Sequence, residues 1–128
     1  MLWDARSEPG GSLLGLDPAV LPKDVRALDI NGVLRAGIEF SGGKRVNYIG
    51  GLATEHAAVV VAAGGEAGPL LASLDPAGDG LRARDNVVAC GSVVRGACSA
   101  VQAVADGREA ARLIHNTFTS SSSTTSSC

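Results

Sequence analysis

The sequence predicts an α/β fold with a small, mostly parallel sheet and flanking helices. Two apolar runs, residues 57–63 and 87–90, lack the alternation of half-exposed strands, which is typical of parallel strands covered on both faces. Residues 99–115 show a helical period. Apolar residues make up 45 % of the chain but aromatic residues only 3 %, which favours a core of Ala, Val, Leu and Ile, common in such sheets. A length of 128 residues allows at most one domain.

Three elements are expected in the first 40 residues. Leu2 and Trp3 end a short strand that enters the Pro-Gly-Gly turn at residues 9–11. Pro22 suits a first helical position, and Gly37 can stop the amphipathic helix that follows it. Residues 38–40 form a second short strand.

In the second half, the two apolar runs are the expected buried strands, and residues 66–84 contain no long element. The helix over 99–115 is expected to pack through a small-residue face, with polar residues on its other side. The Ser/Thr-rich residues 116–128 form a disordered tail. The expected packing face consists of Ala100, Ala103, Val104, Gly107, Ala110, Ala111 and Ile114, and the polar side of Gln102, Asp106, Glu109 and Arg112.

Charge and composition exclude several classes of partner. A net charge of −2 without a basic block argues against nucleic acid or an anionic membrane surface. The chain has neither an apolar run of about 20 residues for a membrane span nor a secretory signal. Cys90, Cys98 and Cys128 form no CxxC pair, and His56 and His115 are expected on the surface. The sequence therefore predicts a cytoplasmic protein without a metal site.

The residues between the second apolar run and the long helix could face a ligand. A buried strand, the tight turn Cys90-Gly91-Ser92 and a helix form a βα unit, whose helix N-terminus offers N–H groups and a positive dipole end to an anion. The alternative is a turn of small residues that serves packing alone. Asp4 is a second residue that could face a ligand. It ends a strand before a Gly-rich turn, and a carboxylate at such a place can bind a ribose diol.

Five blocks stand out along the chain: DARSEPGG at 4–11, LPKDV at 21–25, GIEF at 37–40, AAG at 62–64, and ACGSVVRG at 89–96 followed by residues 103–111. In this order, they resemble the FAD-binding half of the glutamate synthase small-subunit family. In these flavoproteins, which have two dinucleotide-binding domains, FAD exchanges electrons with NADPH. The resemblance implies a partial, Rossmann-like FAD-binding domain over residues 1–115.

The resemblance implies five cofactor-binding positions in the N-terminal blocks. Asp4 takes the place of the glutamate that binds the adenosine ribose, with Arg6 beside it. Gly10 and Gly11 wrap the cofactor, and Val46 meets the adenine through its backbone. The flavin does the redox chemistry, so no catalytic side chain is implied.

Four further positions are implied in the later blocks. Ala63 and Gly64 lie near the pyrophosphate, and Gly91 and Ser92 lie near the ribityl chain. The helix that begins near Ser99 aims its N-terminus at the flavin pyrimidine edge, where negative charge develops on reduction.

The sequence departs from the family pattern at three places. The opening strand with its G-x-G-x-x-G turn has no counterpart, residues 66–84 replace the NADPH-binding domain, and Ser92 replaces an aspartate. Two interpretations follow. The chain is an FAD-binding oxidoreductase module without an NAD(P)H site, completed by a partner chain that supplies the missing strand or domain. Alternatively, it is a truncated, non-catalytic remnant or interaction subunit without a bound cofactor.

Overall fold

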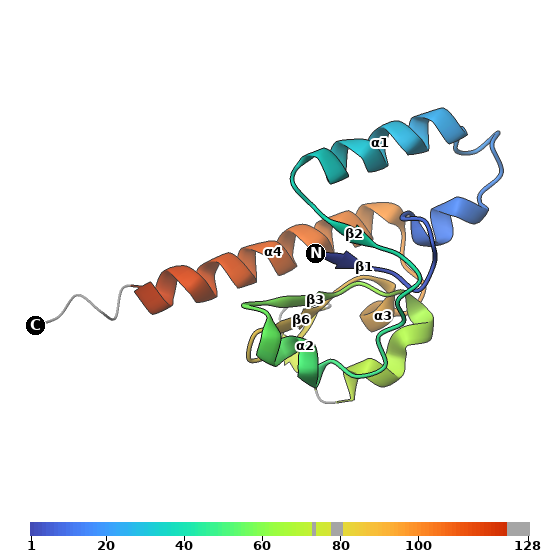
Figure 1. Cartoon of the computed structure of the whole chain (residues 1–128). Coiled ribbons are helices and arrows are strands. Elements are labelled where there is room, and N and C mark those ends of the chain that lie inside the picture. The colour runs from blue at the N-terminus through green and yellow to red at the C-terminus, as the bar shows by residue number, and fades with distance from the viewer. Residues whose placement is uncertain (73, 78–80, 123–128) are drawn as a thin grey trace, which may run out of the picture. The chain divides into compact units, whose positions relative to one another are not determined.

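A computed structural model of the chain describes residues 1–72, 74–77 and 81–122 (Figure 1). The chain divides into two compact units, Met1–Asn47 (unit 1) and Tyr48–Cys128 (unit 2). The sequence predicted a single domain over residues 1–115. Unit 1 and unit 2 are therefore described separately.

Unit 1 contains two short strands and one long helix. β1 (Leu2–Trp3) pairs in parallel with β2 (Phe40–Ser41), and a 3-10 turn, η1 (Gly11–Gly15), and α1 (Lys23–Arg35) connect them. The predicted strand at residues 2–3 and the predicted helix are confirmed, whereas the strand predicted at 38–40 lies at 40–41.

The two ends of α1 follow from backbone chemistry. Pro22 is the N-cap residue, at φ −56° and ψ 142°, one position before the helical position predicted for it. After the helix, Gly37 adopts φ 94°, a left-handed conformation that glycine allows without strain. This position explains why the helix stops where the sequence predicted.

No residue of unit 1 is buried. On α1, which was predicted to be amphipathic, Val25 is 44 % exposed and Leu28 is 72 % exposed. Unit 1 is therefore held by half-buried contacts and backbone hydrogen bonds rather than by a closed apolar core.

Unit 2 is built on a four-stranded sheet with the strand order β3-β6-β5-β4. β3 (Val59–Val61) pairs in parallel with β6 (Val87–Ala89), but β5 (Leu81–Arg84) pairs antiparallel with both β6 and β4 (Asp75–Ala77). The predicted α/β class is confirmed. The prediction of a mostly parallel sheet is wrong for this sheet, because β4 and β5 form within residues 66–84 and their pairings, β4 with β5 and β5 with β6, are antiparallel.

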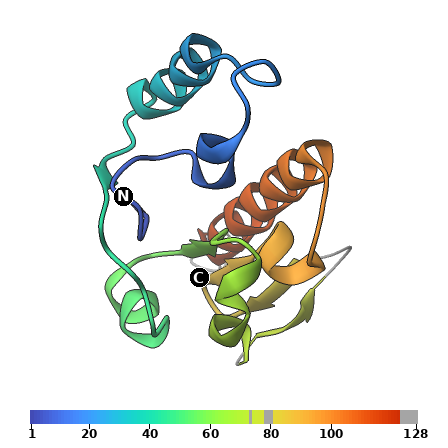
Figure 2. The same cartoon turned by 90° about the vertical axis from the view of Figure 1, so that its right-hand side faces the viewer.

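Helices cover both faces of this sheet (Figures 1 and 2). One face packs against α2 (Gly50–Glu55), η2 (Gly65–Leu71) and α3 (Ser92–Arg95), and the other packs against α4 (Ala100–Ser122). The apolar core of unit 2 thus consists of two layers of side chains with the sheet between them.

β6 is buried on both faces, as its apolar run predicted. Val87 and Ala89 point into the layer beneath α3 and η2, whereas Val88 and Cys90 point toward α4. β3 lies at the edge of the sheet, and its Val60 is 49 % exposed. The prediction that both apolar runs are covered on both faces is therefore correct for β6 and wrong for β3.

The helix predicted over 99–115 exists, but its packing face differs from the prediction. The helix contacts the sheet through Ala110, Leu113 and Ile114. Asp106, predicted on the polar side, is 4 % exposed, whereas Val104, predicted on the packing face, is 66 % exposed. The observed face is thus rotated away from the predicted small-residue stripe.

α4 also continues through Ser122, into the segment predicted as a disordered tail. Thr117 Oγ1 donates a hydrogen bond to the Leu113 carbonyl oxygen, and Thr119 Oγ1 donates one to that of His115. Phe118 helps line a hollow of about 140 Å³ beside β6, so the extra turns carry an apolar contact surface. Residues 123–128 of the predicted tail lie outside the described residues.

Candidate functional site

The first group of predicted positions gathers at the turn after β1. Asp4 follows β1 at the edge where both parallel strands end, and its Oδ1 accepts a hydrogen bond from the Arg6 backbone N–H at 2.8 Å. The backbone of this segment also pairs with the last residue of β2 and with the chain beyond it: Asp4 N donates to Ser41 O at 3.3 Å, and Lys44 N donates to Asp4 O at 2.9 Å. The turn holds a half-buried carboxylate at the edge where α/β sheets bind ligands.

Arg6 and the two glycines complete this turn. Arg6 Nη1 donates to the Gly11 carbonyl oxygen, which ties the side chain to the Gly-Gly segment. Gly10 and Gly11 adopt φ 130° and 54°. A Cβ at Gly10 would lie 3.2 Å from side-chain atoms of Ile30 and Leu14, so close packing also requires this glycine.

The second group lies in unit 2, where β3 and β6 end at the same edge because they are parallel. Ala63 and Gly64 follow β3, and Gly91 and Ser92 follow β6. Gly64 adopts φ 83° and ψ 176°, and Gly91 adopts φ 79° and ψ −153°, both in a region that only glycine populates readily. Beyond this edge, η2 packs against α3.

Replacing Gly64 by alanine should therefore destabilise unit 2 through the backbone alone. Among the residues that the structure describes, no atom beyond its chain neighbours lies within 4 Å of a Cβ at this position, so steric clash with them contributes nothing. The expected loss of unfolding free energy is about 1–3 kcal/mol. Chemical denaturation followed by circular dichroism measures it. Gly107→Ala in exposed α4, where helix propensity favours alanine, should instead stabilise by up to about 1 kcal/mol.

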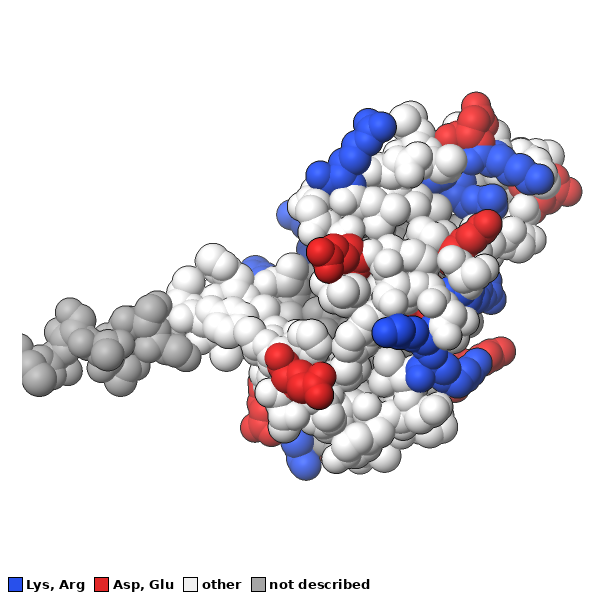
Figure 3. Space-filling view, viewed as in Figure 1, with Lys and Arg blue, Asp and Glu red and all other residues white. Residues whose placement is uncertain are grey.

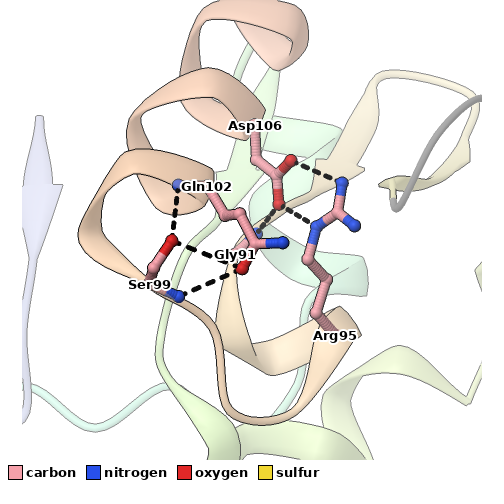
Figure 4. A network of polar contacts seen from close by, with 5 residues as sticks. All are labelled: Gly91, Arg95, Ser99, Gln102 and Asp106. Carbon is pink, nitrogen blue, oxygen red and sulfur yellow. Dashed lines mark hydrogen bonds and ion pairs between the residues drawn. The ribbon is translucent and has the colours of Figure 1, made fainter.

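A buried carboxylate occupies the turn between β6 and α3 (Figure 4). Asp106 Oδ2 accepts hydrogen bonds from Gly91 N at 3.2 Å and Arg95 Nε at 2.7 Å, and Asp106 Oδ1 accepts one from Arg95 Nη2 at 2.8 Å. The hydrogen bonds from Arg95 lower the pKa of Asp106 despite the opposing effect of desolvation, and the Gly91 N–H adds to the lowering. The site residues predicted from the sequence did not include this carboxylate, because no local spacing signals its pairing with Arg95, eleven residues away.

The N-terminus of α4 is closed by its own side chains. Gln102 N donates to Ser99 Oγ at 3.2 Å, and Ser99 N donates to Gln102 Oε1 at 3.1 Å, which forms a capping box (Figure 4). The S-x-x-Q spacing of the sequence is its signature. The sequence predicted that this helix N-terminus faces the flavin. Two of its backbone N–H groups, those of Ser99 and Gln102, instead donate to each other's side chains.

Cys90 belongs to the core rather than to a reactive site. Its side chain is 4 % exposed and contacts the layer beneath α4. Burial raises the pKa of the Cys90 thiol, and the nearby negative charge of Asp106 raises it further. Both effects disfavour the nucleophilic thiolate. Cys90 and Cys98 are free, and Cys128 lies outside the described residues.

The predicted site residues are thus divided between unit 1 and unit 2. Asp4, Arg6, Gly10 and Gly11 come together in unit 1, where Val46 is half-buried. The other four positions come together in unit 2. Their assignment to a cofactor stays a prediction.

Within residues 1–72, 74–77 and 81–122, no three His, Cys, Asp or Glu side chains are placed to hold a metal ion together. Among those same residues, no helix has the length and apolar character that crossing a bilayer requires. On the visible face, basic and acidic side chains are interspersed on each unit (Figure 3).

No protein-family model, curated protein or solved structure matches the chain.

Proposed function

We propose that the chain is an FAD-binding module of an oxidoreductase, in which a flavin carries electrons between NAD(P)H and an acceptor. The resemblance of the five sequence blocks motivates the proposal, and the turn around Asp4 is the observation that supports it best. In this proposal a partner chain supplies the NAD(P)H site. When bound, the flavin provides the electron-transfer chemistry, and this chain positions it.

The residues of the Asp4 turn fit the adenosine end of such a cofactor. Asp4 Oδ1 is fixed by the Arg6 backbone N–H, while Oδ2 accepts no hydrogen bond from the described residues. A carboxylate at the end of a parallel strand, with one oxygen available, suits the diol of a ribose. The Arg6 guanidinium on Gly11 holds the turn in this shape.

The turn around Gly91 fits less well. The Gly91 N–H already donates to Asp106, so it would have to exchange that bond before it could donate to a cofactor. Ser92 offers a neutral hydroxyl where the family has a carboxylate. We therefore expect weak flavin binding by the isolated chain. A purified chain that carries stoichiometric flavin after gel filtration would contradict this expectation.

Asp4→Asn tests the proposal, because asparagine keeps the side-chain acceptor of the turn but removes the charge. Charge-assisted hydrogen bonds contribute about 1.5–3 kcal/mol and neutral ones about 1 kcal/mol, so FAD affinity should fall about tenfold. Equilibrium dialysis at increasing FAD concentration measures the affinity. Asp17→Asn is the matched control, because Asp17 Oδ1 accepts the Ala19 N–H at the same 2.8 Å in the same unit. Equal affinities of the Asp4 and Asp17 variants would exclude Asp4 from the site.

A specific observation favours the second interpretation, a non-catalytic remnant or interaction subunit without a cofactor. In unit 2, both the Gly91 N–H and the Arg95 side chain are engaged by Asp106. If a chain with the circular dichroism of a folded protein binds no FAD at millimolar concentration, this second function replaces the first.

A further inference from the structure

The donors around Asp106 form a complete anion-binding set, and none of them comes from the helix that carries Asp106. Gly91 lies at the end of β6, and Arg95 lies in α3. The backbone N–H and the two guanidinium nitrogens converge on one carboxylate at 2.7–3.2 Å (Figure 4). A planar guanidinium that binds two oxygens of one group recognises carboxylate and phosphate alike.

The exposed fractions of Asp106 and Arg95 show that the Asp106 carboxylate fills the space between these donors. The Asp106 side chain is 5 % exposed, and the Arg95 side chain is 30 % exposed. Solvent therefore reaches the guanidinium but hardly the carboxylate. Gly91 is buried as well, so its N–H is satisfied from within the protein.

We infer that Gly91 and Arg95 form an anion site that Asp106 fills from within, as an autoinhibitory contact. While the Asp106 carboxylate is in place, it accepts the hydrogen bonds of these donors, and its negative charge repels an external carboxylate or phosphate group. The inference rests on the proposed function in one respect: it accounts for the weak flavin binding that we expect of the isolated chain. The anion site itself requires no flavin.

Removing the carboxylate tests the site directly. Asp106→Ala vacates the space of a carboxylate, which formate can refill. The thermal midpoint of the variant should fall, and sodium formate should restore about half of the loss or more, since a ligand that binds only the folded state stabilises it. Sodium chloride at equal ionic strength controls for screening and should not restore it. Inorganic phosphate is the second probe.

The double variant Asp106→Ala with Arg95→Gln identifies the donor. It should lose the response to formate, because the guanidinium that would bind the anion is gone. If Asp106→Ala is unfolded, formate should fold it, as circular dichroism would show. A variant that formate neither stabilises nor folds would overturn the inference, and so would an equal response of the double variant.

FAD titration then connects the anion site to the proposed function. Asp106→Asn keeps the shape and an accepting oxygen but releases Arg95 from its ion pair, and FAD affinity should rise about tenfold. If formate rescues Asp106→Ala but neither Asp4→Asn nor Asp106→Asn changes FAD binding, the anion site stands and the proposed function fails. If Asp4→Asn weakens FAD binding while formate has no effect, the proposed function stands and the inference fails.

Discussion

Leu81→Ala should be among the most destabilising single substitutions in unit 2. Leu81 is 2 % exposed and lies on β5, in the layer that Val88, Cys90 and Ala110 complete. Truncation leaves a cavity beneath α4 that these neighbours fill only in part. The expected loss of unfolding free energy is about 3 kcal/mol.

Urea denaturation followed by far-ultraviolet circular dichroism measures the loss, because the signal of α4 reports on unit 2, whereas the single tryptophan, Trp3, lies in unit 1. Val101→Ala is the control: Val101 is 80 % exposed on α4, and its truncation should change the free energy by no more than about 0.5 kcal/mol. Similar losses in both variants would mean that the layer beneath α4 is not a packed core.

The sequence predicts β3 and β6 of unit 2 but not β4 and β5, and the reason is physical. β3 and β6 lie within uninterrupted runs of small and β-branched residues, which remain apolar whichever neighbours they acquire. β4 and β5 are short and surrounded by Gly, Pro and Asp, so neither a period of two nor a long apolar run indicates them. They form because β6 presents a free edge with which β5 can pair.

The face through which α4 packs on the sheet could not be predicted, because the helix shows little contrast between a small-residue side and the other sides. Alanine and glycine occur around most of its circumference, so a stripe of small residues fits several rotations. The rotation is fixed by Leu113 and Ile114 on the sheet and by the ion pair of Asp106 with Arg95. A charged residue is assigned to the surface by default, and only the three-dimensional partner of Asp106 overrides that default.

The two candidate carboxylates, Asp4 and Asp106, also differ in whether the sequence could predict them. Asp4 was found because the end of a strand and the following Gly-rich turn are adjacent in sequence. Asp106 was missed because its partners, Gly91 and Arg95, meet it only after α3 and α4 have packed. Sequence patterns detect local geometry, whereas a buried polar contact depends on the fold.

The ion pair of Asp106 with Arg95 should also determine much of the acid sensitivity of unit 2. Asp106→Asn removes a buried negative charge and with it the ion pair that Asp106 forms with the Arg95 guanidinium, which should cost about 2 kcal/mol at pH 7. This is less than the roughly 3–5 kcal/mol of a fully buried pair, because Arg95 remains 30 % exposed.

The pH dependence gives the sharper test. Because the pKa of Asp106 is lowered in the folded chain, its stabilising effect is complete above the ordinary carboxyl pKa and is lost as the pH falls through the lowered value. The stability difference between the wild-type chain and Asp106→Asn should therefore be constant near neutrality and shrink below about pH 4.

Glu109→Gln on the same helix is the matched control. Glu109 forms a comparable two-bond pair with Arg112, but both side chains are solvent-exposed, at 38 % and 64 %, so their interaction is screened and should contribute nothing measurable. Urea midpoints of the three proteins between pH 2.5 and pH 7 separate the two pairs. Parallel curves for the wild-type chain and Asp106→Asn over that range would mean that the Asp106 carboxylate contributes no charge-dependent stability, since protonation would then cost the wild-type chain no more than it costs the variant.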